Sequence, residues 1–519
     1  MRFACIPIAV ILACAGCAPA RHRAPEPAAA ERAKTGARIV RVDGAARFQT
    51  MDNFAASDCW SMQKIGAWSL ENRNRVADLL FSREKGIGLS AWRFNIGAGI
   101  CPELGAGSWR TAETFETGEG RYDWSRQGPE QWFLGAAKER GVRQFIAFAN
   151  SPPARMTRNG LTFCTPESGE TNLKQGYEGQ YAVYLADVLE HFRRHPDPSR
   201  RVEFGWISPV NEPQWEWNYP GQEGNRVPND TIKAIYRALD KELKQRGLST
   251  RILGVESGSL AIPGMTGSVD MHGAKYGDYI RDFCGDPEME RIMGRLICSH
   301  SYRADLVPHS MVNARIRLRN LMDKYPGWKF WQSEYCILQG SKGQGGGGRD
   351  LGMDTALEVA RVIHHDLVLL NAAAWQWWTA VSPERFKDGL IYTDYRSPGD
   401  AETVHPSKML WALGNFSRFI RPGARRIALE GASETKGLLG SAWDDEETGC
   451  VVVVFVNMAD APETVRIEAG RVPGRTVRHW TPWLTTAAPG DDLRRGETFS
   501  AGRDHVIPPR SVVTLVGGG

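Results

Sequence analysis

The feature that most constrains the fold is an alternation of short β-rich runs with longer amphipathic helical patterns between about residues 50 and 420. Eight such runs are each followed by a helical pattern, which is typical of a (β/α)8 barrel. The runs lie at 54–57, 91–97, 143–150, 202–213, 251–257, 295–302, 329–335 and 373–379. Because no GxGxxG motif follows an early run, a doubly wound dinucleotide-binding sheet is disfavoured.

The sequence pattern changes after residue 422. Beyond this point, short β-rich runs are separated at close spacing by Gly, Pro and Asp, as in antiparallel sheets. The early run 38–51 is also strand-like and precedes the first barrel strand. We therefore predict an α/β protein with a (β/α)8 TIM barrel at 52–422. A C-terminal antiparallel β-sandwich at 423–519 would be completed by the N-terminal strand.

The N-terminus has the pattern of an export signal. A positively charged start precedes an apolar stretch at 3–16 that is too short to span a bilayer. Ala-Gly-Cys, ending at Cys17, is typical of a bacterial lipoprotein signal at 1–17, and this cysteine would carry a lipid anchor to the membrane. An ordinary secretory peptide cleaved a few residues later is the alternative. Residues 18–37 are rich in Pro, Ala and Arg and would form a flexible tether. We expect a protein of the periplasm or outer membrane, or a secreted one.

Composition and motifs exclude several classes of function. The 64 basic and 60 acidic residues give a net charge of +4 without long basic runs, so we expect no nucleic-acid partner. Beyond Cys17 there is no CxxC spacing, and neither HExxH nor GxSxG occurs. We therefore predict no metal site and no acyl-transfer chemistry.

Two glutamates stand at the ends of barrel strands, which is where barrel enzymes have their active sites. Glu212 follows the fourth run in SPVNEPQW, and Glu334 lies at the end of the seventh in WQSEYC. A charge at the tip of an apolar strand is costly unless it has a partner or a use. A carboxyl pair across a barrel mouth suits glycoside hydrolysis, with retention at about 5–5.5 Å and inversion at about 6.5–9.5 Å. Salt-bridged structural glutamates are the alternative from these residues alone.

Four motifs occur in order at four of these runs, and together they resemble glycoside hydrolase family 30 of clan A. The motifs are WRFNIGAG, NSPPARMTRNG, ISPVNEPQW and WQSEY. More narrowly, residues 38–519 resemble the endo-β-1,6-galactanase-like branch of this family. The resemblance implies the barrel with its side β-domain and a retaining mechanism. That mechanism needs two carboxyls and water, so we expect no cofactor.

The resemblance also implies roles for individual residues. Glu212 matches the family's general acid/base and Glu334 its nucleophile, which would form a glycosyl-enzyme ester. Asn211 matches an asparagine that hydrogen-bonds the sugar 2-hydroxyl, with a turn or capping role as the alternative. Arg93 matches an arginine beside the nucleophile, where an ion pair that does not touch substrate is the alternative. Tyr302 matches a residue whose hydroxyl reaches the nucleophile.

Further candidates near the strand ends complete the predicted substrate site. Trp378, at the end of the eighth run, matches the family's aromatic platform beneath the sugar. Trp60, Trp215 and Trp217 lie in strand-end loops and are either further platforms or core residues. Three polar candidates remain. Asn150 could line the barrel mouth or belong to a loop whose shape is set by the following prolines, and Asp58 could hydrogen-bond a sugar hydroxyl or cap the next segment. His300 would point to the same side of its strand as Tyr302, or it could be a buried core histidine.

We therefore predict an exported retaining β-glycoside hydrolase that cleaves β-1,6-linked galactan side chains through a glycosyl-enzyme intermediate. The expected partner is an oligo- or polysaccharide. The first-strand segment NFAASDCWSMQKIGAWS and the loops QEGNRVPND and GQGGGG depart from the galactanase pattern, which leaves the glycan open. The alternatives are a β-1,6-glucanase, a terminal β-galactosidase or β-fucosidase, and a non-catalytic surface glycan-binding lipoprotein.

Overall fold

A computed structural model describes the chain from residue 36 onward, with five short gaps. The described residues are 36–262, 264–268, 275–305, 308–338, 346–395 and 401–519. The predicted signal sequence, its Cys17 and nearly all of the tether lie outside them. Residues from Ala37 to Gly519 form one compact unit. Within the described residues, no helix is both long and apolar enough to cross a membrane.

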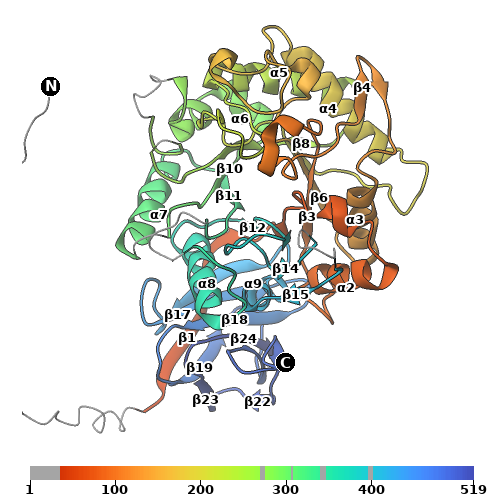
Figure 1. Cartoon of the computed structure of the whole chain (residues 1–519). Helices are drawn as coiled ribbons and strands as arrows, with labels where there is room; N and C mark the ends of the chain where they lie inside the picture. The colour runs from red at the N-terminus through yellow and green to blue at the C-terminus, as the bar shows by residue number, and fades with distance from the viewer. Residues whose placement is uncertain (1–35, 263, 269–274, 306–307, 339–345, 396–400) are drawn as a thin grey trace, which may run out of the picture. The chain divides into compact units, whose positions relative to one another are not determined.

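The parallel strands close into a barrel (Figure 1). Two hydrogen-bonded groups run in the orders β2–β12–β11–β10–β9 and β3–β6–β7–β8. A bridge from Ser57 to Arg93 joins the groups at one seam, and Leu253 alone separates β8 from β9 at the other. The predicted barrel is therefore confirmed, with its fifth strand broken in two. The strands are β2 (Asn53–Ala56), β3 (Ala91–Asn95), β6 (Gln144–Phe148), β7 (Trp206–Ser208), β8 (Arg251–Ile252), β9 (Gly254–Ser257), β10 (Leu296–His300), β11 (Lys329–Glu334) and β12 (Ala374–Trp377).

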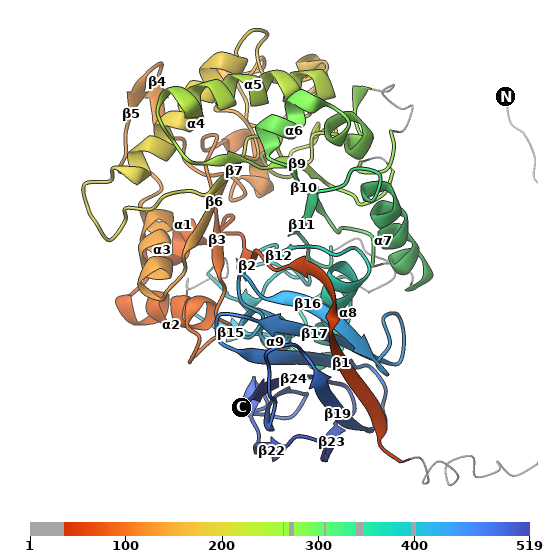
Figure 2. The same cartoon turned by 180° about the vertical axis from the view of Figure 1, so that it is seen from behind.

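Helices follow the barrel strands in the βα order that the sequence predicts. They are α1 (Met62–Ile65) and α2 (Leu70–Phe81) after β2, then α3 (Gly128–Glu139), α4 (Glu178–Arg193), α5 (Asn229–Gln245), α6 (Pro287–Met293), α7 (Pro308–Met322), α8 (Met353–Val368) and α9 (Lys408–Ser417). Figure 2 shows α3 to α7 around the outside of the strands. Their apolar faces bury against the outer surface of the strands, which forms the main core.

Short elements elaborate the loops of the barrel. They are the hairpin β4 (Glu116–Gly118) and β5 (Arg121–Tyr122), the strands β13 (Val381–Ser382), β14 (Ile391–Tyr392) and β15 (His405–Pro406), the 3₁₀ turns η1 (Pro102–Gly107), η2 (Ala154–Met156) and η3 (Pro166–Ser168), and the π turn η5 (Ile280–Cys284). The hydrophobic patterns of the sequence do not predict these elements.

The barrel interior changes character along the strands. An apolar plug, which includes the contacting rings of Trp206 and Trp331, fills the amino-terminal half. On β3, Ala91 belongs to this plug, and Arg93 and Asn95 follow on the same side because side chains alternate along a strand. Polar chemistry therefore begins directly above the plug, at the carboxyl ends of the strands.

The remaining strands form one ten-stranded, mostly antiparallel sheet that includes the N-terminal strand. Its members are β1 (Arg38–Thr50), β16 (Arg425–Glu430), β17 (Leu438–Asp445), β18 (Cys450–Asn457), β19 (Glu463–Arg471), β20 (His479–Thr485), β21 (Arg494–Arg495), β22 (Phe499–Ser500), β23 (Asp504–Ile507) and β24 (Ser511–Gly518). The predicted addition of the early strand to this region is confirmed, and Figure 2 shows β1 among the C-terminal strands.

This continuous sheet differs from a sandwich of two separately hydrogen-bonded sheets. β1 pairs with β16 on one edge and with β19 on the other, antiparallel and parallel respectively. Register shifts along β1 bend the strand, so it joins the two halves of the sheet into one. Helices α8 and α9 pack against this sheet. The predicted boundary between residues 422 and 423 stays a prediction.

A buried ion pair ties the barrel helices to the strand ends. Arg315 of α7 donates to Asp366 of α8 at 2.7 Å, and both side chains are fully buried. Asp366 also accepts from the ring nitrogen of Trp375 on β12 at 2.9 Å and from Ser301, directly after β10, at 3.1 Å. This one carboxylate therefore connects two helices with two adjacent strand ends.

We expect Arg315→Leu to lower the free energy of unfolding by about 3–5 kcal/mol, because Asp366 would stay buried without its cation. Urea unfolding at pH 7 measures this loss. Arg319→Leu on the same helix is the matched control, because its partner Asp323 is half exposed and the loss should be small. Equal effects of the two substitutions would contradict the assignment.

Candidate active site

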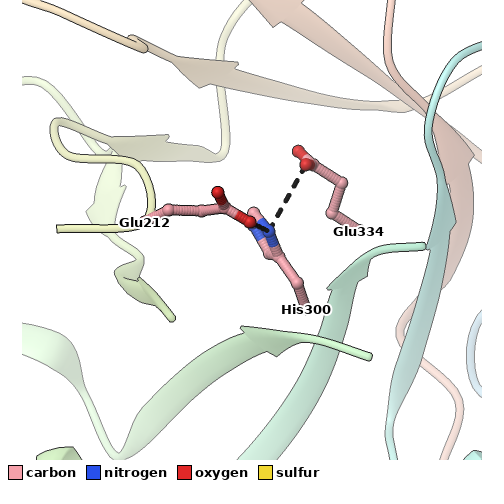
Figure 3. Close-up of side chains that lie close together, drawn as sticks. All are labelled: Glu212, His300 and Glu334. Atoms are coloured by element: carbon pink, nitrogen blue, oxygen red, sulfur yellow. Dashed lines mark hydrogen bonds and ion pairs between the residues drawn. The ribbon is translucent and has the colours of Figure 1, made fainter. Parts of the chain in front are cut away.

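The two glutamates singled out in the sequence meet at the carboxyl end of the barrel. Glu212 lies in the loop after β7, and Glu334 is the last residue of β11. Figure 3 shows both side chains converging on His300, the last residue of β10. One carboxylate oxygen from each glutamate and one ring nitrogen of His300 lie within 4.8 Å of one another. Carboxylate oxygens this close are compatible with the short separation of the carboxyl groups in a double-displacement pair, about 5–5.5 Å.

Two donors fix the carboxylate of Glu334. Arg93 donates to Oε2 at 2.5 Å, and the hydroxyl of Tyr302 donates to Oε1 at 2.9 Å. Burial alone would lower the pKa of Arg93, but Glu256 and Glu334 raise it above its ordinary value. Arg93 has no exposed surface and contacts the carboxylates of both Glu256 and Glu334.

Glu212 has fewer partners than Glu334. Its Oε1 faces Nδ1 of His300 at 2.9 Å, and its backbone N–H donates to the carbonyl of Glu256 at 2.8 Å. Burial raises the pKa of Glu212, the neighbouring charge of Glu334 adds to this rise, and His300 opposes it. Of the two effects that raise this pKa, burial is the larger and repulsion from Glu334 the smaller.

A cavity of about 390 Å³ opens over the glutamate pair. Its walls include most of the candidates from the ends of the barrel strands and the loop after β7. They are Asn211, Glu212, Trp215, Trp217, Tyr302, Glu334 and Trp378. The buried Oδ1 of Asn211 has no hydrogen-bond partner among the described residues. Tyr219 and Arg303 also line the cavity and were not singled out in the sequence.

Three sequence candidates lie behind this wall instead of lining the cavity. Trp60 packs edge-on against Trp378 with ring centroids 5.1 Å apart. Asp58 accepts from the backbone N–H of Asn95 at 2.9 Å, and burial raises its pKa well above the ordinary value. Asn150 is buried as well. These side chains support the residues that face the cavity.

Glu223, which the sequence analysis missed, holds this supporting layer together. It has no exposed surface, and its Oε1 accepts from the ring nitrogen of Trp60 and the amides of Asn95 and Asn150, each at 3.1 Å. Burial raises its pKa. Glu223 lies in the loop QEGNRVPND, and no pattern in a loop sequence shows that the loop folds inward.

The structure also brings in Glu256 of β9, whose side chain is fully buried and faces His300. A glutamate inside the otherwise apolar run RILGVES is the signal that could have revealed it, since a buried charge requires partners.

The cluster of Glu212, His300 and Glu334 is close enough to suggest a cation site. Its donor atoms, however, already face one another, and Glu334 is additionally bound by Arg93 and Tyr302. A guanidinium in contact with one ligand would repel a metal ion, so these residues do not fit one.

Comparison with known families agrees with this geometry. The model described as O-Glycosyl hydrolase family 30 matches residues 37–392, more than half of the chain. The protein belongs to glycoside hydrolase family 30.

Solved structures show which relatives share the fold. A conserved exported protein from Bacteroides fragilis is 30% identical, with a TM-score of 0.82 over 92% of this chain and 100% of that one. The catalytic domain of GH30 xylanase C from Talaromyces cellulolyticus is 20% identical, with a TM-score of 0.67 over 93% of this chain and 100% of that one. An endo-β1,6-glucanase is 18% identical, with a TM-score of 0.66 over 94% of each chain.

Among curated proteins, mouse (Mus musculus) lysosomal acid glucosylceramidase is 24% identical over 316 residues, which is 57% of this chain. The match spans only 55% of that relative's length. The named activities of these relatives differ from one another, so they do not show the galactanase branch.

We expect Glu223→Leu to lower the free energy of unfolding by about 1–3 kcal/mol, because three buried N–H groups would lose their acceptor. Chemical denaturation measures the change. Glu223→Gln is the control, since it keeps an acceptor oxygen at nearly the same place. A leucine variant as stable as the glutamine variant would contradict this role.

Proposed function

We propose that the protein hydrolyses β-glycosides by double displacement, with Glu334 as the nucleophile and Glu212 as the general acid/base. The observation that carries the proposal is the approach of the two carboxylates to within 4.8 Å beside an open cavity. Arg93 and Tyr302 orient Glu334, while the buried Glu212 favours its protonated form. Each glutamate therefore has the environment that its role requires.

In the first half-reaction, a carboxylate oxygen of Glu334 attacks the anomeric carbon. The bond from that carbon to the leaving oxygen breaks, and Glu212 gives its proton to the leaving oxygen. The products are a released alcohol and a glycosyl ester on Glu334.

In the second half-reaction, Glu212 is a carboxylate and removes a proton from water. The water oxygen attacks the anomeric carbon and the ester bond breaks, which restores ionised Glu334 and protonated Glu212. Two inversions at one carbon give net retention.

Residues around the cavity supply the contacts that we assign to the sugar. The unpartnered Oδ1 of Asn211 is placed to accept a hydrogen bond from the 2-hydroxyl. Trp378 offers an aromatic face beneath the ring, and Trp215 with Tyr219, which is 57% exposed, offers further surface toward the leaving group. Asp58, Trp60 and Asn150 lie behind the cavity wall and act through the residues that line it.

The substrate that we favour is a β-1,6-linked galactan side chain, on the motifs shared with that branch of the family. The similarity to an endo-β1,6-glucanase supports a 1,6 linkage and keeps β-1,6-glucan as the second candidate. Terminal β-galactosidase and β-fucosidase activities remain alternatives. A glycan-binding role without catalysis is disfavoured, because both glutamates keep partners that orient them.

We further infer that the protein is exported to the cell envelope or secreted. The inference rests on the apolar segment before Cys17 and on the similar exported protein of Bacteroides fragilis. The lipid attachment at Cys17 rests on the sequence alone.

We expect Glu212→Ala to lower kcat/KM on the natural glycan about 10²- to 10⁴-fold, because the leaving oxygen would receive no proton. On an aryl β-glycoside with an acidic phenol, kcat/KM should stay close to the wild-type value. Glu334→Ala, the comparison variant, should lose both activities. Steady-state kinetics on the two substrates measures this difference, and equal losses on both by Glu212→Ala would exclude the acid role.

A glycan panel tests the substrate. We expect oligosaccharide release from β-1,6-galactan at a higher rate than from β-1,6-glucan, xylan or arabinogalactan, with the β-anomer formed first in proton NMR spectra. Glu334→Ala is the blank for contaminating activity. Release from β-1,6-glucan alone would favour the second candidate, and release from none of the four would remove the galactanase assignment.

A further inference from the structure

We propose that Glu256 and His300 form a positioning pair that fixes the net charge of the active site and thereby assigns the exchangeable proton to Glu212. The proposal rests on the roles proposed above for Glu212 and Glu334. Neither Glu256 nor His300 exchanges atoms with the substrate in this account. They act through the two glutamates.

Glu256 is held as a buried anion by four side chains. Its Oε1 accepts from Ser208 at 2.6 Å and lies 3.3 Å from a guanidinium nitrogen of Arg93. Its Oε2 accepts from Ser333 at 2.5 Å and faces Nε2 of His300 at 3.1 Å. Burial by itself would raise its pKa, but Arg93, His300 and Ser208 bring it far below the ordinary value.

The backbone also connects Glu256 with Glu212. Both residues have positive φ, 53° and 43°, a region that costs a non-glycine residue about 1–3 kcal/mol. The N–H of Glu212 donates to the carbonyl of Glu256 at 2.8 Å, so one strained residue supports the other. Strain of this kind persists where the surrounding structure requires a particular side-chain direction.

His300 lies between this anion and the catalytic pair. Its Nε2 faces Glu256, and its Nδ1 faces Glu212 at 2.9 Å and Glu334 at 3.3 Å. Both ring nitrogens face carboxyl groups, an arrangement that suits an imidazolium, which donates from both nitrogens. Burial alone would lower the pKa of His300, but the surrounding carboxylates raise it to about 10.

The cluster then contains two cations, Arg93 and His300, and three carboxyl groups. It is neutral when one of the three holds a proton. Among the described residues, Glu256 has four donor partners and Glu334 has Arg93, Tyr302 and His300, whereas the carboxyl group of Glu212 has His300 alone. The proton therefore resides on Glu212, the least supported of the three.

The net charge of the cluster is also zero after the first half-reaction. Glu334 loses its charge when it becomes an ester, and Glu212 loses its proton to the leaving oxygen. Two carboxylates, Glu212 and Glu256, then face the two cations. A buried site keeps zero net charge in both states, which avoids the cost of an uncompensated charge in a low-dielectric interior.

The other titratable groups around the pair do not change the net charge of the cluster. The thiol of Cys298 and the hydroxyls of Tyr236 and Tyr302 stay neutral, because burial raises their pKa values well above the ordinary ones. The exposed Arg303 at the cavity rim favours the charged form of Glu212, but it is hydrated.

The test is the pH dependence of kcat/KM on β-1,6-galactan or, if the glycan panel selects it, β-1,6-glucan. The alkaline limb of this profile reports the loss of the proton from the general acid. His300→Asn removes a cation, so Glu212 should keep its proton to higher pH and the limb should move up by about one pH unit or more. Glu256→Gln removes an anion, so the limb should move down by a similar amount. Ser333→Ala removes a donor without changing the charge and should leave the limb in place.

Opposite shifts support the pair, whereas lower kcat with an unmoved limb in both variants would show a purely structural role. A measurement on the wild-type protein does not depend on the variants folding: with ¹⁵N-labelled histidine, one doubly protonated imidazole should persist at pH 8. Its absence would overturn the proposal. If Glu212→Ala and Glu334→Ala remain fully active, the proposed function itself fails, which is a distinct outcome.

Discussion

The structure depends on a set of charges buried at the carboxyl end of the barrel. Arg93, His300 and three glutamates come from five different strands or strand ends, and none is more than 8% exposed. Isolated charges would destabilise such an interior by several kcal/mol each, so they persist only as mutual partners. The polar layer therefore requires each of these strands to end at a matching level along the barrel axis.

The rest of the barrel satisfies that requirement by separating its layers. The apolar plug around Trp206 and Trp331 fills the amino-terminal half and keeps water from reaching the ions from below. Above it, Asp366 anchors Ser301, which immediately follows His300, and Glu223 anchors the wall that supports Trp378. Residues that never face the cavity thus determine the positions of those that do.

Much of this architecture could be predicted from the sequence because it is encoded locally. Strand-forming runs, helix periodicity and the motifs around Glu212 and Glu334 each occupy a short stretch of chain. Glu223 could not be predicted, because its burial follows from how a long loop folds over the barrel mouth. The single ten-stranded sheet was likewise beyond prediction, because it results from bends in β1 and not from any residue pattern in the C-terminal region.

The place of β1 has a consequence for how the chain is made. A ribosome delivers this strand before the other described strands, whereas its partners β16 and β19 follow only after the whole barrel; Arg38, for example, hydrogen-bonds Gly431, 393 positions downstream. Sheet completion must therefore wait until synthesis has ended, and such distant pairing slows folding.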